Sequence, residues 1–266
     1  MPARRARIRI EVTRVVVITG ASRGLGAALA RRLAGPGVSL GLIARDGVAL
    51  EGVAEACRAA GAAVRCALVD VRDASAMREV LLRWDAEEPV DMAIANAGIA
   101  AGTRPDGSPE GLEAFRAQID VNLMGAVHLV EALLPGMRGR GRGRFVLVSS
   151  VAAFRGLPDS PGYCASKAAL WGYGEAVRAG LAGIGVGMTL VAPGFFDSAM
   201  GERWVGARPF SVSADVAAGK VLRGVERGAA VVAFPWVLAW VLRFSVLVPA
   251  KWVDAVVRRV VFRIRG

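Results

Sequence analysis

A tyrosine, a lysine and a serine in this chain have side chains suited to moving a proton to or from a carbonyl oxygen. Tyr163 and Lys167 are four residues apart, so on a helix their side chains lie on the same face. A free tyrosine has a pKa of about 10, and a neighbouring ammonium group favours the phenolate and lowers that pKa. The hydroxyl of Ser150, upstream of both, could hold a carbonyl group in line and stabilise charge on its oxygen. These residues predict acid–base chemistry at a ketone or a secondary alcohol.

A glycine-rich turn near the start of the chain could bind a phosphate group. It lies between an apolar run and a helical segment. Glycines allow the backbone to approach a pyrophosphate closely, and the free N–H groups at a helix start favour an anion. Because the turn follows a strand candidate and opens a helix, its context fits a dinucleotide-binding site. Its candidate binding residues are Gly20, Ser22, Arg23, Gly24, Leu25 and Gly26.

Seven short apolar segments alternate with segments of helical length. The strand candidates are Val15–Thr19, Val38–Ala44, Ala63–Val69, Met92–Asn96, Arg144–Ser149, Val186–Val191 and Ala229–Phe234. Strict alternation predicts an α/β fold, a doubly wound parallel sheet covered on both faces. Such sheets bind ligands beyond the carboxyl ends of their strands, where the glycine-rich turn and Ser150 fall. We expect a basic leader over residues 1–13, this domain over 14–235 and a tail over 236–266.

The glycine-rich turn is followed by Asn96-Ala97-Gly98 after the fourth strand and then by Tyr163-x-x-x-Lys167. With these motifs in this order, the chain resembles the short-chain dehydrogenase/reductase family over roughly residues 14–235. The resemblance implies one Rossmann domain with a seven-stranded parallel sheet, and hydride transfer with NAD(H) or NADP(H). One departure is Ala95, where relatives often have a further asparagine, and we expect its effect to stay local to the strand.

The resemblance also implies roles for single residues. Tyr163 would be the acid/base, Lys167 would lower its pKa and bind the nicotinamide ribose, and Ser150 would orient the substrate. Asn122 matches the asparagine that anchors a water beside the lysine; by itself it could equally be a polar residue that bends a helix. The cofactor site would further include Asp70, Val71, Asn96, Ala97 and Gly98, and a turn that holds the nicotinamide carboxamide, with Pro193, Gly194, Phe196 and Ser198.

Charge near the second strand bears on which cofactor is used. An acidic residue at the strand's end would bond the ribose 2′-hydroxyl of NAD(H) and repel a 2′-phosphate, but this strand is followed by Arg45. Arg45 and Arg23 could pair with the 2′-phosphate of NADP(H), so we expect NADP(H) over NAD(H). Asp46 argues against this preference unless it caps the following helix. By resemblance Asp70 would bond the adenine amino group; otherwise it caps a helix or turn.

The chain is both apolar and basic, with 54% hydrophobic residues, a mean hydropathy of +0.44 and a formal net charge of +11. This composition excludes extensive disorder. Cys57, Cys66 and Cys164 form neither a disulfide framework nor a zinc-ligand pair, and His128 is the only histidine. We therefore expect no metal site.

The excess charge lies at the two ends of the chain. Residues 1–14 carry a net charge of +4 and residues 229–266 carry +5, which leaves +2 for residues 15–228. The basic ends could bind anionic lipid or nucleic acid, or reflect an arginine-rich composition without function. Because the ends lack alternating aromatic and basic residues, nucleic acid is not an expected partner.

The tail combines an apolar segment with a basic one. Val231–Ala250 has a single charged residue and is interrupted by Pro235 and Pro249. Trp236–Val248 predicts a helix of about 20 Å, too short to cross a bilayer, and Trp252–Arg265 predicts a basic amphipathic helix. Such a pair is typical of a peripheral membrane anchor. The alternative is a contact between the subunits of a homodimer or homotetramer.

These features together predict an NADP(H)-dependent oxidoreductase in the cytoplasm, peripheral to the inner face of a membrane. Apolar residues in and before Ser198–Pro209, such as Phe195 and Phe196, favour a small hydrophobic carbonyl or alcohol substrate, unless they cover the core instead. Two alternatives stay open: a soluble oligomeric 3-oxoacyl-type reductase, and a membrane-associated scaffold that binds the cofactor without catalysis. The intact Ser150, Tyr163 and Lys167 set speaks against the scaffold.

Overall fold

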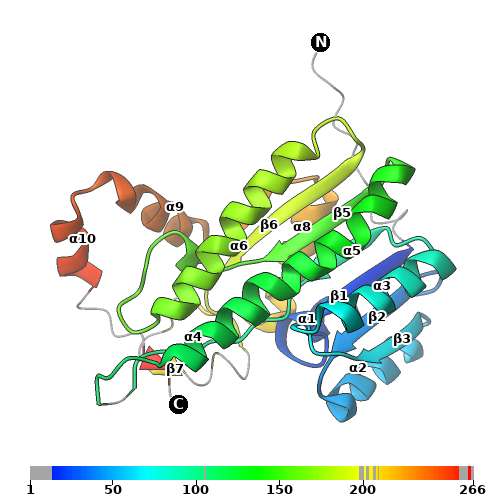
Figure 1. Ribbon diagram of the computed structural model, residues 1–266, viewed down its shortest axis with the longest axis horizontal. Helices are drawn as coiled ribbons and strands as arrows, with labels where there is room; N and C mark the ends of the chain where they lie inside the picture. Colours follow the sequence, from blue (N-terminus) through cyan, green and yellow to red (C-terminus); the bar gives the residue numbers. More distant parts are fainter. Residues whose placement is uncertain are drawn as a thin grey trace.

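The computed structural model of the protein describes residues 14–104, 106–197, 201, 204–205, 208, 210–257 and 263–264, so the basic leader over residues 1–13 lies outside it. At its centre is a parallel sheet with strand order β3-β2-β1-β4-β5-β6-β8 (Figure 1). The strands are β1 (Val15–Thr19), β2 (Ser39–Ala44), β3 (Ala63–Leu68), β4 (Met92–Ala95), β5 (Gly143–Val148), β6 (Val186–Pro193) and β8 (Val231–Phe234). The predicted seven-stranded, doubly wound sheet is confirmed.

Helices cover both faces of this sheet. One face carries α3 (Ala74–Glu87), α5 (Gly125–Arg140) and α6 (Pro161–Gly180), and the other α1 (Gly24–Leu33), α2 (Gly47–Ala59) and α8 (Ala214–Glu226) (Figure 1). Successive strand residues point to opposite faces, so Val15 and Val17 of β1 pack into one core while Val16 and Ile18 pack into the other. Burial on both faces explains the nearly continuous apolar runs of the strands.

The helix before β5 is continuous from Leu112 to Arg140 and combines α4 (Leu112–Ile119), a π-helical turn (Asp120–Met124) and α5. Among the described residues it is the one helix long and apolar enough to cross a membrane. Half of its most apolar stretch is buried, and Leu129 and Leu133 belong to the core against the sheet. This segment is therefore a core helix of the α/β fold.

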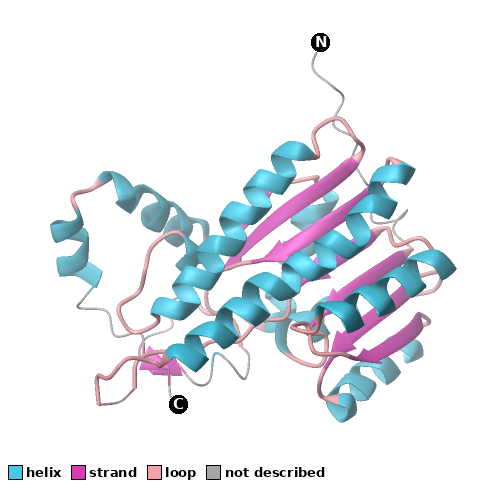
Figure 2. Ribbon diagram, in the orientation of Figure 1, coloured by secondary structure: helices cyan, strands magenta, loops and turns pink. Residues whose placement is uncertain are grey.

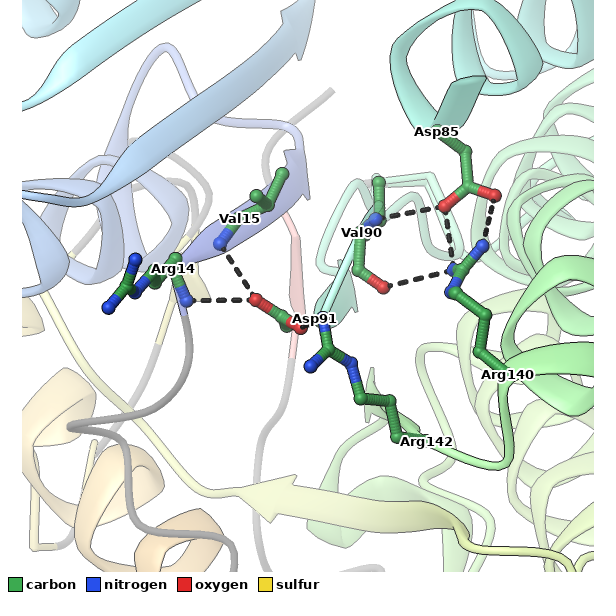
Figure 3. A network of polar contacts seen from close by, with 7 residues as sticks. All are labelled: Arg14, Val15, Asp85, Val90, Asp91, Arg140 and Arg142. Atoms are coloured by element: carbon green, nitrogen blue, oxygen red, sulfur yellow. Dashed lines mark hydrogen bonds and ion pairs between the residues drawn. The ribbon is translucent and has the colours of Figure 1, made fainter. Parts of the chain in front are cut away.

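Carboxylates tie the amino ends of the strands to the loop between α5 and β5 (Figure 3). Asp91, just before β4, accepts hydrogen bonds from two backbone N–H groups at the start of β1, at 2.9 and 3.2 Å, and pairs with Arg142 at 3.2 Å. Arg140 makes a two-point ion pair with Asp85, each contact 2.8 Å long. Two arginines of the Arg-Gly run before β5 thus have structural partners at the edge of the sheet opposite the expected site.

The chain after β8 forms α9 (Trp236–Phe244), a 3-10 turn (Ser245–Leu247) and α10 (Ala250–Val257), which stand apart from the sheet in Figures 1 and 2. The predicted helix after Pro235 is thus confirmed. The prediction of a helix over residues 252–265 is wrong at its end, because β9 (Arg263–Ile264) pairs antiparallel with β7 (Trp204–Val205). Isoleucine favours strands, and β7 supplies the partner strand for Arg263 and Ile264.

Candidate active site

Ser150, Tyr163, Lys167 and Asn122 come together beyond the carboxyl ends of β4 and β5. Ser150 follows β5, Tyr163 and Lys167 lie at the start of α6, and Asn122 lies in the π-helical turn. The Lys167 Nζ atom is 6.0 Å from the centre of the Tyr163 ring. A Cβ atom on Gly98 would lie 3.3 Å from both the Lys167 Nζ and the Asn122 Oδ1 atoms. The structure therefore brings the predicted catalytic set into one site.

Burial shifts the two titratable groups of this set toward their neutral forms. The Lys167 Nζ atom is buried and donates a 2.9 Å hydrogen bond to the Val148 carbonyl oxygen. Burial lowers the pKa of Lys167 to about 8, because the charged form loses its hydration. Burial likewise raises the pKa of Tyr163 to about 12, opposed by a hydrogen bond with Ser150. Desolvation thus outweighs the expected lowering of the tyrosine pKa by the lysine.

Asn122 connects the loop after β4 to α6. Its Oδ1 atom accepts a hydrogen bond from the Ile99 N–H at 2.7 Å, and its Nδ2 donates to the Ile99 carbonyl and to Ser166 Oγ, both at 2.9 Å. Ser166 in turn donates to the Tyr163 carbonyl oxygen at 2.8 Å. The residue lies where the helix adopts π geometry, a departure that often marks functional positions. The water that Asn122 would anchor stays a prediction.

The glycine-rich turn packs too closely for side chains. Gly20 has a φ of +66°, and a Cβ on it would lie 2.7 Å from the Ala97 Cα atom. A Cβ on Gly26 would lie 2.2 Å from the Gly20 carbonyl oxygen. Asn96 Nδ2 donates to the carbonyl oxygens of Thr19 and Gly20, at 3.1 Å each. The Asn96-Ala97-Gly98 motif therefore supports a turn whose bare backbone can approach a ligand.

The start of α1 differs from the starts of the other helices on its face. Arg23 is the N-cap residue, but its side chain makes no capping hydrogen bond, and the first turn has no acidic residue. Asp46 and Ser213, which precede α2 and α8, each accept a hydrogen bond from a backbone N–H group. The N–H groups of α1 and its helix dipole thus remain available to an anion. These residues fit the pyrophosphate of a dinucleotide.

Arg23 and Arg45 lie exposed near the carboxyl end of β2, each beside a carboxylate. Arg23 Nη2 is 2.9 Å from Asp46 Oδ2, and Arg45 Nη1 is 3.6 Å from Asp70 Oδ2. Asp46 also accepts a 3.1 Å hydrogen bond from the Ala49 N–H, so its expected role as a helix cap is confirmed. Two guanidinium groups therefore lie at this position, each beside a carboxylate.

Asp70 has a structural role in the turn after β3. Its carboxylate accepts hydrogen bonds from the backbone and the guanidinium of Arg72, at 3.0 and 2.7 Å. These contacts lower the pKa of Asp70. The turn-capping alternative is therefore realised, while the contact with an adenine amino group stays a prediction. The neighbouring Val71 is buried, and its carbonyl oxygen lies 2.9 Å from His128 Nδ1.

The turn after β6 is fixed to β8. Pro193 ends β6, and the Gly194 N–H donates a 2.6 Å hydrogen bond to the Phe234 carbonyl oxygen. Phe196 forms an isolated bridge with Val212. Ser198, the expected carboxamide partner, lies outside the described residues, so the carboxamide contact stays a prediction.

Glu110 and Gln118, which no sequence motif marks, hold the start of α6. Glu110 accepts a 2.7 Å hydrogen bond from the Gly162 N–H and a 2.8 Å hydrogen bond from Gln118 Nε2. Gln118 Oε1 accepts from the Ala101 N–H at 2.8 Å. Gly162 directly precedes Tyr163, so these contacts position the tyrosine. Within the described part of the chain, no three His, Cys, Asp or Glu side chains are grouped to hold a metal ion.

Known proteins resemble this chain in sequence and in fold. An oxidoreductase of Myxococcus xanthus (strain DK1622), named as uncharacterized, is 38% identical over 247 residues, which are 92% of this chain and 97% of the relative. A short chain dehydrogenase from Burkholderia cenocepacia J2315 in complex with NADP has a TM-score of 0.78 and 27% identity, over 94% of this chain and 99% of that one. A short chain dehydrogenase from Mycobacterium paratuberculosis bound to NAD has a TM-score of 0.74 and 26% identity, over 85% and 97%.

The same assignment follows from the family model. A model described as short chain dehydrogenase matches residues 14–208, which contain the glycine-rich turn and the catalytic set. The solved neighbours carry NAD or NADP. The match spans most of the chain, which belongs to the short-chain dehydrogenase family.

Proposed function

We propose that this oxidoreductase uses NADP(H) to interconvert a ketone and a secondary alcohol. The observation that carries the proposal is the joint placement of Ser150, Tyr163 and Lys167 beside the glycine-rich turn. A nicotinamide cofactor is supported by the solved neighbours, which bind NAD or NADP. The pair of cations Arg23 and Arg45 favours the phosphorylated form.

A nicotinamide cofactor, when held by the glycine-rich turn, would supply the hydride that a carbonyl carbon receives in ketone reduction. The Tyr163 hydroxyl gives its proton to the carbonyl oxygen, and the Ser150 hydroxyl donates a hydrogen bond to the same oxygen. Lys167, whose pKa of about 8 leaves it largely protonated at neutral pH, stabilises the phenolate that remains. Asn122 would hold the water that returns a proton to this pair. Alcohol oxidation runs through the same groups in reverse.

The two tyrosines of the chain allow a matched test of this mechanism. Tyr163→Phe should lower turnover by about a hundredfold to ten-thousandfold, the usual worth of a general acid. Tyr173→Phe is the control, because Tyr173 lies further along the same helix and its buried hydroxyl has no hydrogen-bond partner among the described residues. NADPH oxidation is measured with steroid, retinoid, 3-oxoacyl and 3-ketosphingoid substrates. Turnover that survives Tyr163→Phe would refute the acid/base role.

The same assay separates the non-catalytic scaffold from the enzyme. A scaffold would bind NADPH in a fluorescence titration yet oxidise it with none of these substrates, in the wild type as in the variants. An active wild type with an inactive Tyr163→Phe variant supports the enzyme.

The cofactor preference is tested by reversing one charge. Arg45→Asp should weaken NADPH binding about tenfold more than NADH binding, because an aspartate repels the 2′-phosphate and accepts the 2′-hydroxyl. Arg138→Asp gives the same change in net charge from an exposed position at the end of α5 and should leave the ratio of the two dissociation constants unchanged. Equal weakening of both cofactors by Arg45→Asp would contradict the NADP(H) preference.

We also infer a lipophilic substrate and a homo-oligomeric, cytoplasmic protein. Apolar groups follow both strands that reach the site: Phe154, four residues after Ser150, and Phe195 and Phe196 after β6, all partly buried. Phe154 packs edge-on against Trp171, with the ring centres 4.7 Å apart.

Light scattering tests the homo-oligomeric state, and a monomer at all protein concentrations would contradict it. If the protein turns over only water-soluble short-chain 3-oxoacyl thioesters, the alternative function, a soluble oligomeric 3-oxoacyl-type reductase, is favoured.

A further inference from the structure

Apart from Arg243, α9 is apolar on all sides, but it packs on the protein with only one of them. Ala239 is buried, and Leu238 and Leu242 pack on the core beneath it. On the other sides, Trp236 and Trp240 keep 68% and 57% of their surface exposed. A helix that is hydrophobic all round ordinarily needs cover on every side. The exposed side of α9 is therefore expected to be covered by a binding partner outside this chain.

This exposed surface continues through the 3-10 turn into α10. Of the large hydrophobic residues exposed in the described part of the chain, ten of eighteen fall between residues 236 and 256, while the others are scattered. We call them the C-terminal apolar face: Trp236, Val237, Trp240, Val241, Phe244, Val246, Leu247, Val248, Trp252 and Val256. A contiguous exposed patch of this kind marks a binding surface rather than ordinary surface composition.

Two of the three charged residues of the same segment, Arg243 and Asp254, contact the body of the protein, and the third, Lys251, is exposed. Arg243 lies 3.6 Å from Glu175 and over the rings of Phe154 and Trp171, at 5.6 and 5.7 Å. Asp254 pairs with Arg155 at 2.7 Å. In a helix that folds onto its own protein, the polar side faces water. Here polar contacts fasten the segment to the body, and the apolar side is presented outward.

Charge decides between a lipid surface and a second copy of the chain. Residues 229–266 carry a net charge of +5. In a two-fold contact the same patch meets itself, so the exposed Lys251 of one copy would face the same ammonium group of the other. An anionic lipid surface supplies the opposite charge, and tryptophan favours the level of the lipid headgroups. At nine residues, α9 is about 14 Å long, which suits a helix lying in the interface rather than crossing it.

The segment that carries this face also contacts both loops beside the catalytic residues. α9 contacts the 3-10 turn Val151–Ala153, which directly follows Ser150, and the Arg155–Asp254 ion pair joins the same loop to α10. Beyond α10, β9 pairs with β7, which lies between the nicotinamide turn and α8. The C-terminal segment thus packs against the loop that follows Ser150.

We propose that the C-terminal apolar face lies on an anionic lipid surface and that the active site takes its carbonyl or alcohol substrate directly from that lipid. The lipid contact stands by itself, whereas the route of the substrate rests on the oxidoreductase function proposed above. The substrate class is then a ketone or alcohol dissolved in the bilayer, not one free in water.

Vesicle binding tests the contact without any turnover. The full chain is sedimented with vesicles of phosphatidylcholine and phosphatidylglycerol in equal parts, and with phosphatidylcholine alone. Wild type should pellet with the anionic vesicles, and Trp240→Glu/Val241→Glu should lower the bound fraction at least about tenfold. The control Leu82→Glu/Val216→Glu places the same charge on exposed hydrophobic residues of α3 and α8 and should bind as wild type does.

Two outcomes would overturn the lipid contact. One is a wild type that stays off both kinds of vesicle. The other is a wild-type dimer in light scattering that becomes a monomer on Trp240→Glu/Val241→Glu without vesicle binding, which would assign the face to a second copy.

Turnover measurements then test whether the substrate reaches the active site from the lipid. A long-chain ketone is supplied in the anionic vesicles, and a short ketone in buffer. Trp240→Glu/Val241→Glu should reduce turnover of the vesicle-borne ketone about as much as it reduces binding, and leave the short ketone unaffected. An equal effect on both ketones would overturn the route. A wild type that oxidises NADPH with neither ketone refutes the proposed function, and the vesicle-binding result is still interpretable.

Discussion

Gly26 and Gly52 both lie in helices, yet only one of them has room for a methyl group. A Cβ on Gly26 would lie 2.2 Å from the Gly20 carbonyl oxygen, whereas a Cβ on Gly52 has no neighbour within 4 Å. Gly26→Ala must push the glycine-rich turn away from α1, and we expect NADPH to bind about tenfold more weakly in a fluorescence titration.

Gly52→Ala is the matched control, since it makes the same chemical change in α2. It should stabilise its helix by about 0.5–1 kcal/mol, because alanine loses less backbone entropy than glycine. Its dissociation constant for NADPH should equal that of the wild type. Equal affinities in the two variants would show that the turn does not hold the cofactor.

Lys167 makes the stability of the fold depend on pH. Burial lowers its pKa from 10.5 to about 8, so between these values the unfolded chain binds more protons than the folded one. The free energy of unfolding therefore rises with pH across this window, and Tyr163, with its raised pKa, acts only above about pH 10. Lys167→Met should remove up to about 3 kcal/mol of the rise between pH 8 and 10, measured by urea unfolding. Parallel curves for the two proteins would argue against a buried ammonium group.

At the scale of single residues, the sequence predicts which residues form the site better than it predicts their burial and hydrogen-bond partners. The placement of Tyr163, Lys167 and Ser150 in one site was predictable because, together with the glycine-rich turn, they match the family pattern. The helix cap at Asp46 was predictable because an acidic residue before a helix commonly caps it. The raised pKa of Tyr163 was not, since it arises from desolvation by segments far apart in the chain. Glu110 was missed because its partner Gly162 is brought to it only by the fold.

At the scale of elements, α6 can hold Tyr163 in place only if its first turn is fixed. Glu110 accepts hydrogen bonds from both Gly162 and Gln118. Glu110→Ala leaves these donors unsatisfied, and we expect a loss of about 1–3 kcal/mol in stability. Because the tyrosine then samples other positions, kcat should fall about tenfold while the KM for the ketone changes little.

Glu113→Ala is the control for this variant, since Glu113 is an exposed residue of α4. It should change neither stability nor kcat. If Glu110→Ala loses stability but keeps the kcat of the wild type, the contact is only structural and does not position Tyr163.

The spacing of apolar residues in the sequence predicts some of the helices and strands but not others. The seven strands were predictable because a sheet buried on both faces leaves unbroken apolar runs. The π-helical turn at Asn122 was not, since it depends on bonds from that side chain to the loop after β4. β9 was mistaken for helix because the apolar spacing of the tail fits both periods, and its partner β7 decided the outcome.

At the scale of the whole molecule, the carboxyl ends and the amino ends of the sheet strands have different roles. The carboxyl ends of the strands hold the predicted catalytic set and the glycine-rich turn, and the amino ends hold the carboxylate network of Asp85 and Asp91 (Figure 3). The C-terminal apolar face lies on a segment that contacts the turn after β5. Stability and catalysis should therefore respond separately to substitutions at the two ends of the strands.

Asp91 provides the test of this separation. Its carboxylate accepts two backbone N–H groups at the start of β1 and pairs with Arg142, and its side chain is only 14% exposed. Asp91→Ala should cost about 1–3 kcal/mol of unfolding free energy, because partly buried donors lose their acceptor. Asp91→Asn keeps one acceptor and should cost less. Both variants should retain the wild-type kcat and NADPH affinity at temperatures where they are folded, since no element of the site rests on this network. A fall in kcat in proportion to the loss of stability would show that the amino and carboxyl ends of the strands are coupled through the sheet.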